Sequence, residues 1–237
     1  MSLLDLEVID LDVEIKDGKV VKARSSGNRL RQFDKVFIGK RADKLYDLLP
    51  RILATCGQSH VLAYTQVGRS AVEVTKTLVL LEIIESHLKH PYIYWFPYIE
   101  PEYSFGEKFK RISKISQDIK NLMERIGGKW PHIDYLSSRQ KVKVKMEWVK
   151  GIKEAIEREV IGMDLQQFME LTSPDELKGD VKILAEKGLD TPSGLNRHLV
   201  MGFPFDYSGD VRKIEDRGLE VLYDGEKVEV GPLAQAL

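Results

Sequence analysis

The chain has 237 residues, of which 43% are hydrophobic and 31% are charged, and its formal net charge is −1. This composition is typical of a folded protein, and the nearly balanced charge offers no overall attraction to nucleic acid or to an anionic membrane. The single cysteine excludes an internal disulfide framework and a self-contained four-cysteine metal site.

The sequence shows no membrane-spanning segment. Its longest apolar run starts at Leu78 and is interrupted by Glu82, which makes it far too short to cross a bilayer. The first residues include Asp5 and Glu7 and lack the basic region of a signal peptide. We therefore expect no membrane span, no nucleic-acid partner and a cytoplasmic location.

The first elements expected are two strands. Residues 6–15 alternate apolar and acidic side chains through most of their length, which predicts a half-buried strand. Asp17-Gly18 predicts a hairpin turn, and residues 20–23 predict the returning strand. The run Ser25 to Asn28 is expected to end this hairpin.

Helices are expected through the middle of the sequence. Apolar residues recur at helical spacing from Ser70 to about His90, and Pro91 is expected to end that helix. Residues 107–125 form an amphipathic pattern that Gly127-Gly128 closes. Further helices are predicted over residues 41–49, within 138–170, and from an N-cap at Ser173 to Gly188.

The composition changes after residue 188, where Gly, Asp and Pro become frequent. Asp224-Gly225 separates two short strand-like runs and predicts a second hairpin or extended lobe. The expected fold class is therefore α+β, a mainly helical body with an N-terminal β-hairpin and a C-terminal extended or β lobe. We expect one domain over 1–237, with regions 1–40, 41–188 and 189–237.

Cys56 and His60 are the first candidate site. Residues four apart share one helix face, and a thiol beside an imidazole is suited to act as a nucleophile or as a ligand of a soft metal. The alternative is a small buried hydrophobic residue. Gly57 lowers helix propensity, so the thiol is expected at a helix end or bend.

A second set of polar residues lies on the helix expected from Ser70 to His90. Glu82, Glu85, His87 and His90 have spacings at which carboxylates and imidazoles could converge on a metal. The alternative is that they satisfy hydrogen bonds of neighbouring groups, as polar residues on a buried helix usually do.

Several motifs follow one another in a specific order. They are Asp17-Gly18, Ser26-Gly27, Arg31-Gln-Phe-Asp34, Arg51-Ile-Leu-Ala-Thr-Cys56-Gly-Gln-Ser-His60, Ser86-His87-Leu-Lys-His90, Gly127-Gly-Lys-Trp-Pro-His132 and Val230-Gly-Pro-Leu-Ala234. In this order they resemble the N-terminal portion of nickel-iron hydrogenase large subunits, a family that includes a quinone-site subunit of respiratory complex I. The resemblance extends over most of the chain.

The sequence departs from that family at the metal ligands. The family signature is Arg-x-Cys-x-x-Cys-x-x-x-His, and Leu53 stands where its first cysteine, a nickel ligand, belongs. The C-terminal Cys-x-x-Cys pair has no counterpart, and Val8-Ile9 replace the Gly-His that follows the family's N-terminal glutamate, a position that Glu7 would fill. Without these thiolates we expect no nickel and no hydrogen turnover, so the chain is not expected to be an enzyme.

The surviving residues imply a non-catalytic role. Cys56 matches the family cysteine that bridges to iron, and the resemblance suggests an accessory scaffold that transiently holds an iron-cyanide-carbonyl fragment during hydrogenase maturation. His60 would then hydrogen-bond the Cys56 sulfur, and Arg51 would balance an anionic fragment. The expected partners are hydrogenase maturation proteins or a hydrogenase small subunit.

Three alternatives remain. The chain could be a catalytically silent interaction subunit of a hydrogenase-like or complex-I-like redox complex. Cys56 could also be a relic in the core of a protein retained for its surface, or Cys56 and His60 could be the nucleophile pair of a thiol enzyme.

Overall fold

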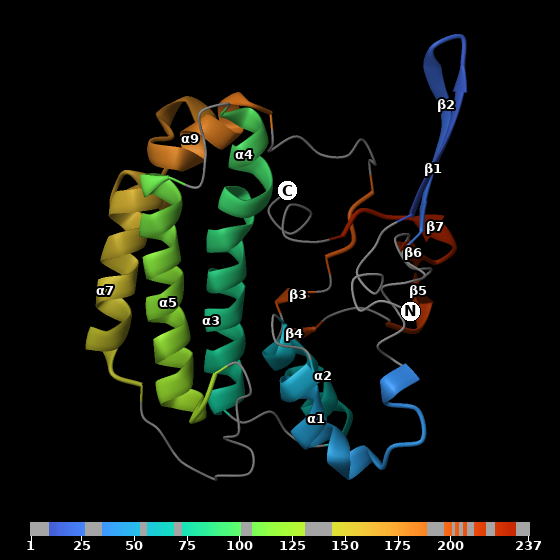
Figure 1. Ribbon diagram of the computed structural model, residues 1–237, viewed down its shortest axis with the longest axis horizontal. Coiled ribbons are helices and arrows are strands. Elements are labelled where there is room, and N and C mark those ends of the chain that lie inside the picture. The colour runs from blue at the N-terminus through green and yellow to red at the C-terminus, as the bar shows by residue number, and fades with distance from the viewer. Residues whose placement is uncertain are drawn as a thin grey trace. The chain divides into compact units, whose positions relative to one another are not determined.

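The computed structural model describes residues 10–26, 35–52, 56–68, 73–100, 106–130, 144–188, 197–200, 202–203, 206–207, 211–216 and 221–230. Helices dominate it, with an antiparallel hairpin near the N-terminus and short strands near the C-terminus (Figure 1), so the predicted α+β class is confirmed. The chain divides into two compact units, Met1–Lys40 with Asp190–Leu237, and Arg41–Leu189. That they form one domain stays a prediction.

The N-terminal hairpin joins β1 (Asp10–Lys16) to β2 (Lys19–Ser26) in antiparallel register. Asp17 and Gly18 have φ angles of 53° and 72°, and a two-residue hairpin turn of this kind requires positive φ at both positions. The predicted hairpin is thus confirmed, although β2 continues through Ser26 instead of ending at Ser25. The part of the first strand predicted before Asp10 lies outside the described residues.

The prediction that this hairpin is half-buried is wrong. Leu11 and Ile15 on the apolar face are 66% and 64% exposed. The alternation is matched by charge pairing on the other face, where Asp12 lies opposite Arg24 and Glu14 opposite Lys22. An alternating pattern therefore identified the apolar face correctly without showing that another element covers it.

The C-terminal strands form two small sheets. β3 (Gly202–Phe203) pairs with β4 (Asp206–Tyr207), and β5 (Ile214–Asp216), β6 (Val221–Tyr223) and β7 (Glu226–Lys227) form an antiparallel three-stranded sheet after η7 (Val211–Lys213). Asp224 and Gly225 again take positive φ in the turn between β6 and β7. The second predicted hairpin is confirmed.

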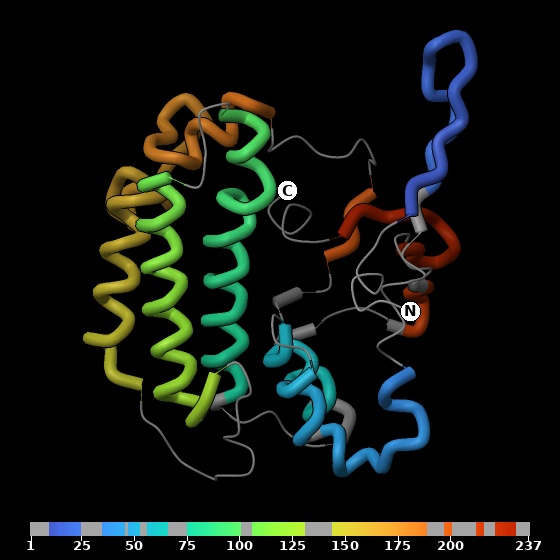
Figure 2. The backbone as a smooth tube through the Cα atoms, in the orientation of Figure 1, coloured from blue at the N-terminus to red at the C-terminus, as the bar shows by residue number. Residues whose placement is uncertain are grey.

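The second unit is helical. Its elements are η3 (Ala42–Lys44), α1 (Leu45–Ile52), α2 (Gly57–Gly68), α3 (Glu73–His90), η4 (Pro91–Trp95), α4 (Phe96–Ile99), α5 (Glu107–Gly127), α7 (Met146–Ile156), η5 (Glu157–Ile161), α8 (Leu165–Met169), η6 (Pro174–Glu176) and α9 (Gly179–Glu186). The tube in Figure 2 shows α5 between α3 and α7, while α2 packs against α1 and α3. None of the helices in the described part of the chain is both long and apolar enough for a membrane span.

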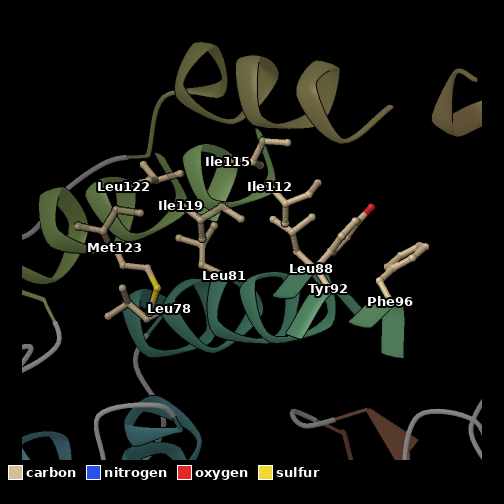
Figure 3. Close-up of a cluster of buried hydrophobic side chains, with 11 residues drawn as sticks. Leu78, Leu81, Leu88, Tyr92, Phe96, Ile112, Ile115, Ile119, Leu122 and Met123 are labelled. Carbon is tan, nitrogen blue, oxygen red and sulfur yellow. The ribbon is translucent and has the colours of Figure 1, made fainter. Parts of the chain in front are cut away.

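The core of this unit lies between α3 and α5. The apolar face of α5 recurs every three or four residues, and in Figure 3 its Ile119 and Met123 point toward Leu78 and Leu81 of α3. Ile119 and Leu78 are fully buried. Each such side chain contributes about 1.5 to 3 kcal/mol of hydrophobic stabilisation.

Pro91 does not end the helical path, contrary to prediction. It occupies the first position of the π-helical turn η4, where its missing N–H is not needed, and Phe96 N–H donates to the Pro91 carbonyl. The turn directs Tyr92 and Phe96 into the core with their rings 4.9 Å apart, while Tyr98 is 85% exposed. The aromatic-rich sequence from Tyr92 to Tyr98, which predicts an apolar packing edge, is thus only partly packed into the core.

The segment predicted as one helix from Ser173 to Gly188 is divided. Ser173 does act as an N-cap, since its hydroxyl accepts from Asp175 N–H at 3.3 Å, but it caps the short η6, and α9 begins only at Gly179. At Gly179 the φ angle is 60°, and an added Cβ would lie 2.4 Å from the Val160 carbonyl oxygen. A close backbone approach therefore interrupts the helix that local pattern predicted.

Candidate functional site

Cys56 directly precedes α2 and is exposed. His60 N–H donates to the Cys56 carbonyl oxygen at 3.3 Å, which is the first intrahelical bond and places Cys56 at the N-cap position. His60 follows one helical turn later, on an exposed part of α2. The structure thus confirms that the thiol sits at a helix end, whereas Glu7, Leu53 and His132 lie outside the described residues.

Gly57 is the first residue of α2 and lies beside α1. A Cβ at Gly57 would lie 3.4 Å from the Cα of Pro50, and Pro50 is itself fully buried within α1. The 3.4 Å separation is an ordinary van der Waals distance, so α1 and α2 lie close together at Gly57 without a steric requirement for glycine there.

Glu82 of α3 closes the first turn of α2. Its carboxylate accepts hydrogen bonds from Gln58 N–H at 2.8 Å, from Ser59 N–H at 3.0 Å and from the Ser59 hydroxyl at 2.6 Å. Glu82 is only 7% exposed. These two N–H groups are the ones that an N-cap side chain normally satisfies, so a residue from another helix takes over that task.

The electrostatics of the site favour uncharged side chains at Cys56 and His60. Partial burial raises the pKa of the Cys56 thiol, the charge of Glu82 raises it further, and the Cys56 backbone N–H lowers it in part. Burial also lowers the pKa of the His60 imidazole. Near neutral pH the site therefore presents a thiol and a neutral imidazole, not the thiolate that a nucleophile requires.

Glu82 also has a perturbed acidity. Burial raises the pKa of its carboxyl group, the Ser59 and Gln58 hydrogen bonds oppose this, and the charge of Glu85 adds to the increase. Gln58 beside it is 2% exposed, and its side-chain carbonyl oxygen has no hydrogen-bond partner among the residues that the structure describes.

Arg51 lies in the last turn of α1 and is engaged with Asp47. Its guanidinium donates to the Asp47 carbonyl oxygen and lies 3.9 Å from an Asp47 carboxylate oxygen. Within the described ranges, no hydrogen bond or ion pair joins Arg51 to Cys56 or His60. Its predicted role toward an anionic fragment is not supported by a contact and stays a prediction.

The polar residues of α3 satisfy neighbouring groups. Glu85 accepts from the Ser116 hydroxyl at 2.7 Å and lies 2.9 Å from the Lys89 ammonium. His87 Nδ1 lies 2.8 Å from the Ile83 carbonyl oxygen, and the His90 ring contacts Tyr94 and Trp95. In the described part of the chain, no group of three or more His, Cys, Asp or Glu residues could hold a metal ion. The hydrogen-bonding alternative is confirmed for Glu82 and Glu85.

An apolar groove that the sequence did not reveal runs between α3 and α7. Its volume is about 510 Å³, and its walls are mainly aliphatic. Its lining includes Leu81, Ile84, Leu88, Val149, Ile152 and Ile156, with His87, Lys153 and Glu157 as the polar members.

Comparison with known proteins shows a distant similarity to the periplasmic NiFeSe hydrogenase large subunit of Desulfomicrobium baculatum. The two are 28% identical over 93 residues, which cover 35% of this chain and 18% of that relative. The chain therefore spans less than a fifth of the relative's length. No family model and no solved structure matches the chain. The resemblance to hydrogenase large subunits is thus supported as a distant relationship.

Proposed function

We propose that this chain is a catalytically silent scaffold, similar to a hydrogenase large subunit, that transiently holds an iron-cyanide-carbonyl fragment at Cys56 during hydrogenase maturation. The observation that carries the proposal is the exposed Cys56 thiol at the start of α2, with His60 one turn later. The distant similarity to a hydrogenase large subunit supplies the context.

The proposed cargo suits a site in which the protein supplies few metal ligands. An iron fragment that carries its own cyanide and carbonyl ligands needs only a small number of additional bonds, so it does not require the three-residue cluster that the described residues lack. A weakly anchored fragment can also leave for an acceptor with more thiolates.

Binding would replace the thiol proton by iron. The S–H bond breaks, an Fe–S bond forms, and the proton passes to solvent, because the lowered pKa of His60 makes its imidazole a poor proton acceptor. The raised pKa of Cys56 means that this exchange depends on the metal, because the free thiolate is scarce at neutral pH.

Iron content after anaerobic co-expression with hydrogenase maturation proteins tests the carrier function. We expect iron to co-purify with the wild-type chain, to be absent from Cys56→Ser and to be reduced in His60→Gln. His87→Gln is the matched control, because His87 is an exposed histidine on α3 without a place in this site. Iron that remains in Cys56→Ser would exclude Cys56 as the anchor.

The second candidate is an interaction subunit that docks a hydrogenase small subunit. It is favoured by exposed aromatic residues, Tyr94 at 59% and Tyr98 at 85%, and by the apolar groove between α3 and α7. Large aromatic side chains are enriched at protein interfaces. In this case a small subunit should co-purify with Cys56→Ser as well as with wild type, and replacing Tyr94 and Tyr98 by Ser should release it.

A further inference from the structure

The first turn of α2 has no conventional cap. Ser, Thr, Asp or Asn usually occupies the N-cap and accepts from the N–H groups two and three residues later. Here the N-cap residue is Cys56, and a thiol is a weak hydrogen-bond acceptor. The corresponding donors, Gln58 N–H and Ser59 N–H, are instead satisfied by Glu82, 23 or 24 positions away in the sequence.

We propose that Glu82 is a positioning residue for the Cys56 site: its carboxylate caps α2 from the neighbouring helix, in place of an N-cap side chain, and so leaves the Cys56 sulfur available to the metal cargo. The availability of the sulfur for cargo rests on the carrier function proposed above. The capping itself rests on geometry alone.

The geometry is that of a cap and not of incidental packing. Both carboxylate oxygens are used, one by Gln58 N–H and the other by the Ser59 N–H and hydroxyl. An anion at this end also complements the positive end of the helix dipole. Because α3 lines the core, Glu82 fixes the start of α2 relative to a buried helix.

Glu85 provides an internal comparison. It is equally buried and stands three residues later on α3, but its partners are Ser116, Lys89 and Lys120. Removing Glu85 should therefore remove a buried carboxylate from the same helix without affecting the first turn of α2.

A cap-exchange experiment tests the capping. In Glu82→Ala, hydrogen exchange of the Gln58 and Ser59 amides, followed by NMR, should accelerate roughly fivefold, which corresponds to the loss of a typical cap. Adding Cys56→Asp supplies a local cap and should restore slow exchange, whereas Cys56→Asp alone should change little. Glu82→Gln, which keeps the volume and one acceptor oxygen, serves if the alanine variant does not fold, and it should show a partial acceleration.

Glu85→Ala is the matched control and should leave these two amides unchanged relative to the rest of the second unit. Unchanged exchange in both Glu82 variants, or a failure of Cys56→Asp to restore it, would overturn the capping role.

A second arm tests the link to the cargo. When the chain is co-expressed anaerobically with maturation proteins, Glu82→Asp, which keeps the charge that raises the Cys56 pKa but shortens the side chain, should hold less iron than wild type, while Glu85→Asp should hold the same amount. Equal iron in Glu82→Asp and wild type would overturn the positioning role even if the cap is real. Absence of iron from wild type would instead refute the carrier function, and the exchange experiment would still decide whether Glu82 caps α2.

Discussion

At the level of single residues, Cys56 combines exposure with low acidity. Its side chain lies at the surface of the second unit, yet partial burial and the nearby Glu82 charge both raise the pKa of its thiol. A catalytic cysteine instead has a lowered thiol pKa, because it lies beside a cationic group. The thiol-enzyme alternative therefore finds no support in the site, whereas a ligand that exchanges its proton for a metal remains compatible with it.

Alkylation of Cys56 tests this directly, because it is the only cysteine. We expect the rate of reaction with iodoacetamide to rise with pH along a titration curve whose midpoint lies above the ordinary thiol range. The rate should be measured from pH 6 upward on metal-free protein, with free cysteine as the reference. A midpoint well below that of free cysteine would show an activated thiolate and contradict the present account.

The raised pKa of Glu82 predicts a pH dependence of stability. The folded state retains the Glu82 proton to a higher pH than the unfolded chain does. The free energy of unfolding that this proton contributes is therefore fully present below the ordinary carboxyl pKa and is lost as pH rises through the raised pKa of the folded state. Urea unfolding of wild type and Glu82→Gln across the acidic range should show wild type losing stability relative to the variant as pH rises. A relative gain of wild type over that window would contradict the sign.

At the level of elements, the sequence predicted the turns and helix ends that depend on the residues at those positions. Asp17-Gly18 and Asp224-Gly225 gave the hairpin turns, and Gly128, with a φ of 85°, ends α5 as expected. The predicted helix end at Pro91 and the single helix predicted from Ser173 to Gly188 are wrong because both segments depend on tertiary packing: a π-helical turn accommodates the proline, and a close contact between Gly179 and Val160 divides the last helix. The hydrogen bonds by which Glu82 caps α2 could not be predicted from local sequence either, because they join two different helices.

Gly179 is expected to be intolerant of any side chain. In Gly179→Ala the new Cβ would lie 2.4 Å from the Val160 carbonyl oxygen, at a φ of 60° that L-residues rarely adopt. We expect a loss of more than about 2 kcal/mol in the free energy of unfolding, measured by chemical denaturation.

Gly151→Ala is the control for that substitution. Gly151 lies inside α7 with nothing within 4 Å of its added Cβ, so alanine should stabilise the protein by about 0.5 to 1 kcal/mol through its higher helix propensity. Similar effects of the two substitutions would mean that the Gly179 contact does not constrain the fold.

At the level of the whole molecule, the sequence predicted the α+β class and the position of Cys56 at a helix end with His60 one turn later, because both follow from periodicity and spacing. A contact between the Cys56 and His60 side chains stays a prediction. It did not reveal the exposed hairpin or the groove between α3 and α7, since these depend on which faces remain uncovered after packing. The distant similarity to a hydrogenase large subunit covers 35% of the chain, and the scaffold role of Cys56 is a proposal that goes beyond that relationship.

Infrared spectroscopy tests the central claim most directly. Protein isolated anaerobically with its maturation partners should show the stretching bands of metal-bound carbon monoxide and cyanide in wild type and none in Cys56→Ser, with both proteins folded by circular dichroism. Bands of equal intensity in Cys56→Ser, or no bands in wild type, would contradict an iron-cyanide-carbonyl fragment held at Cys56.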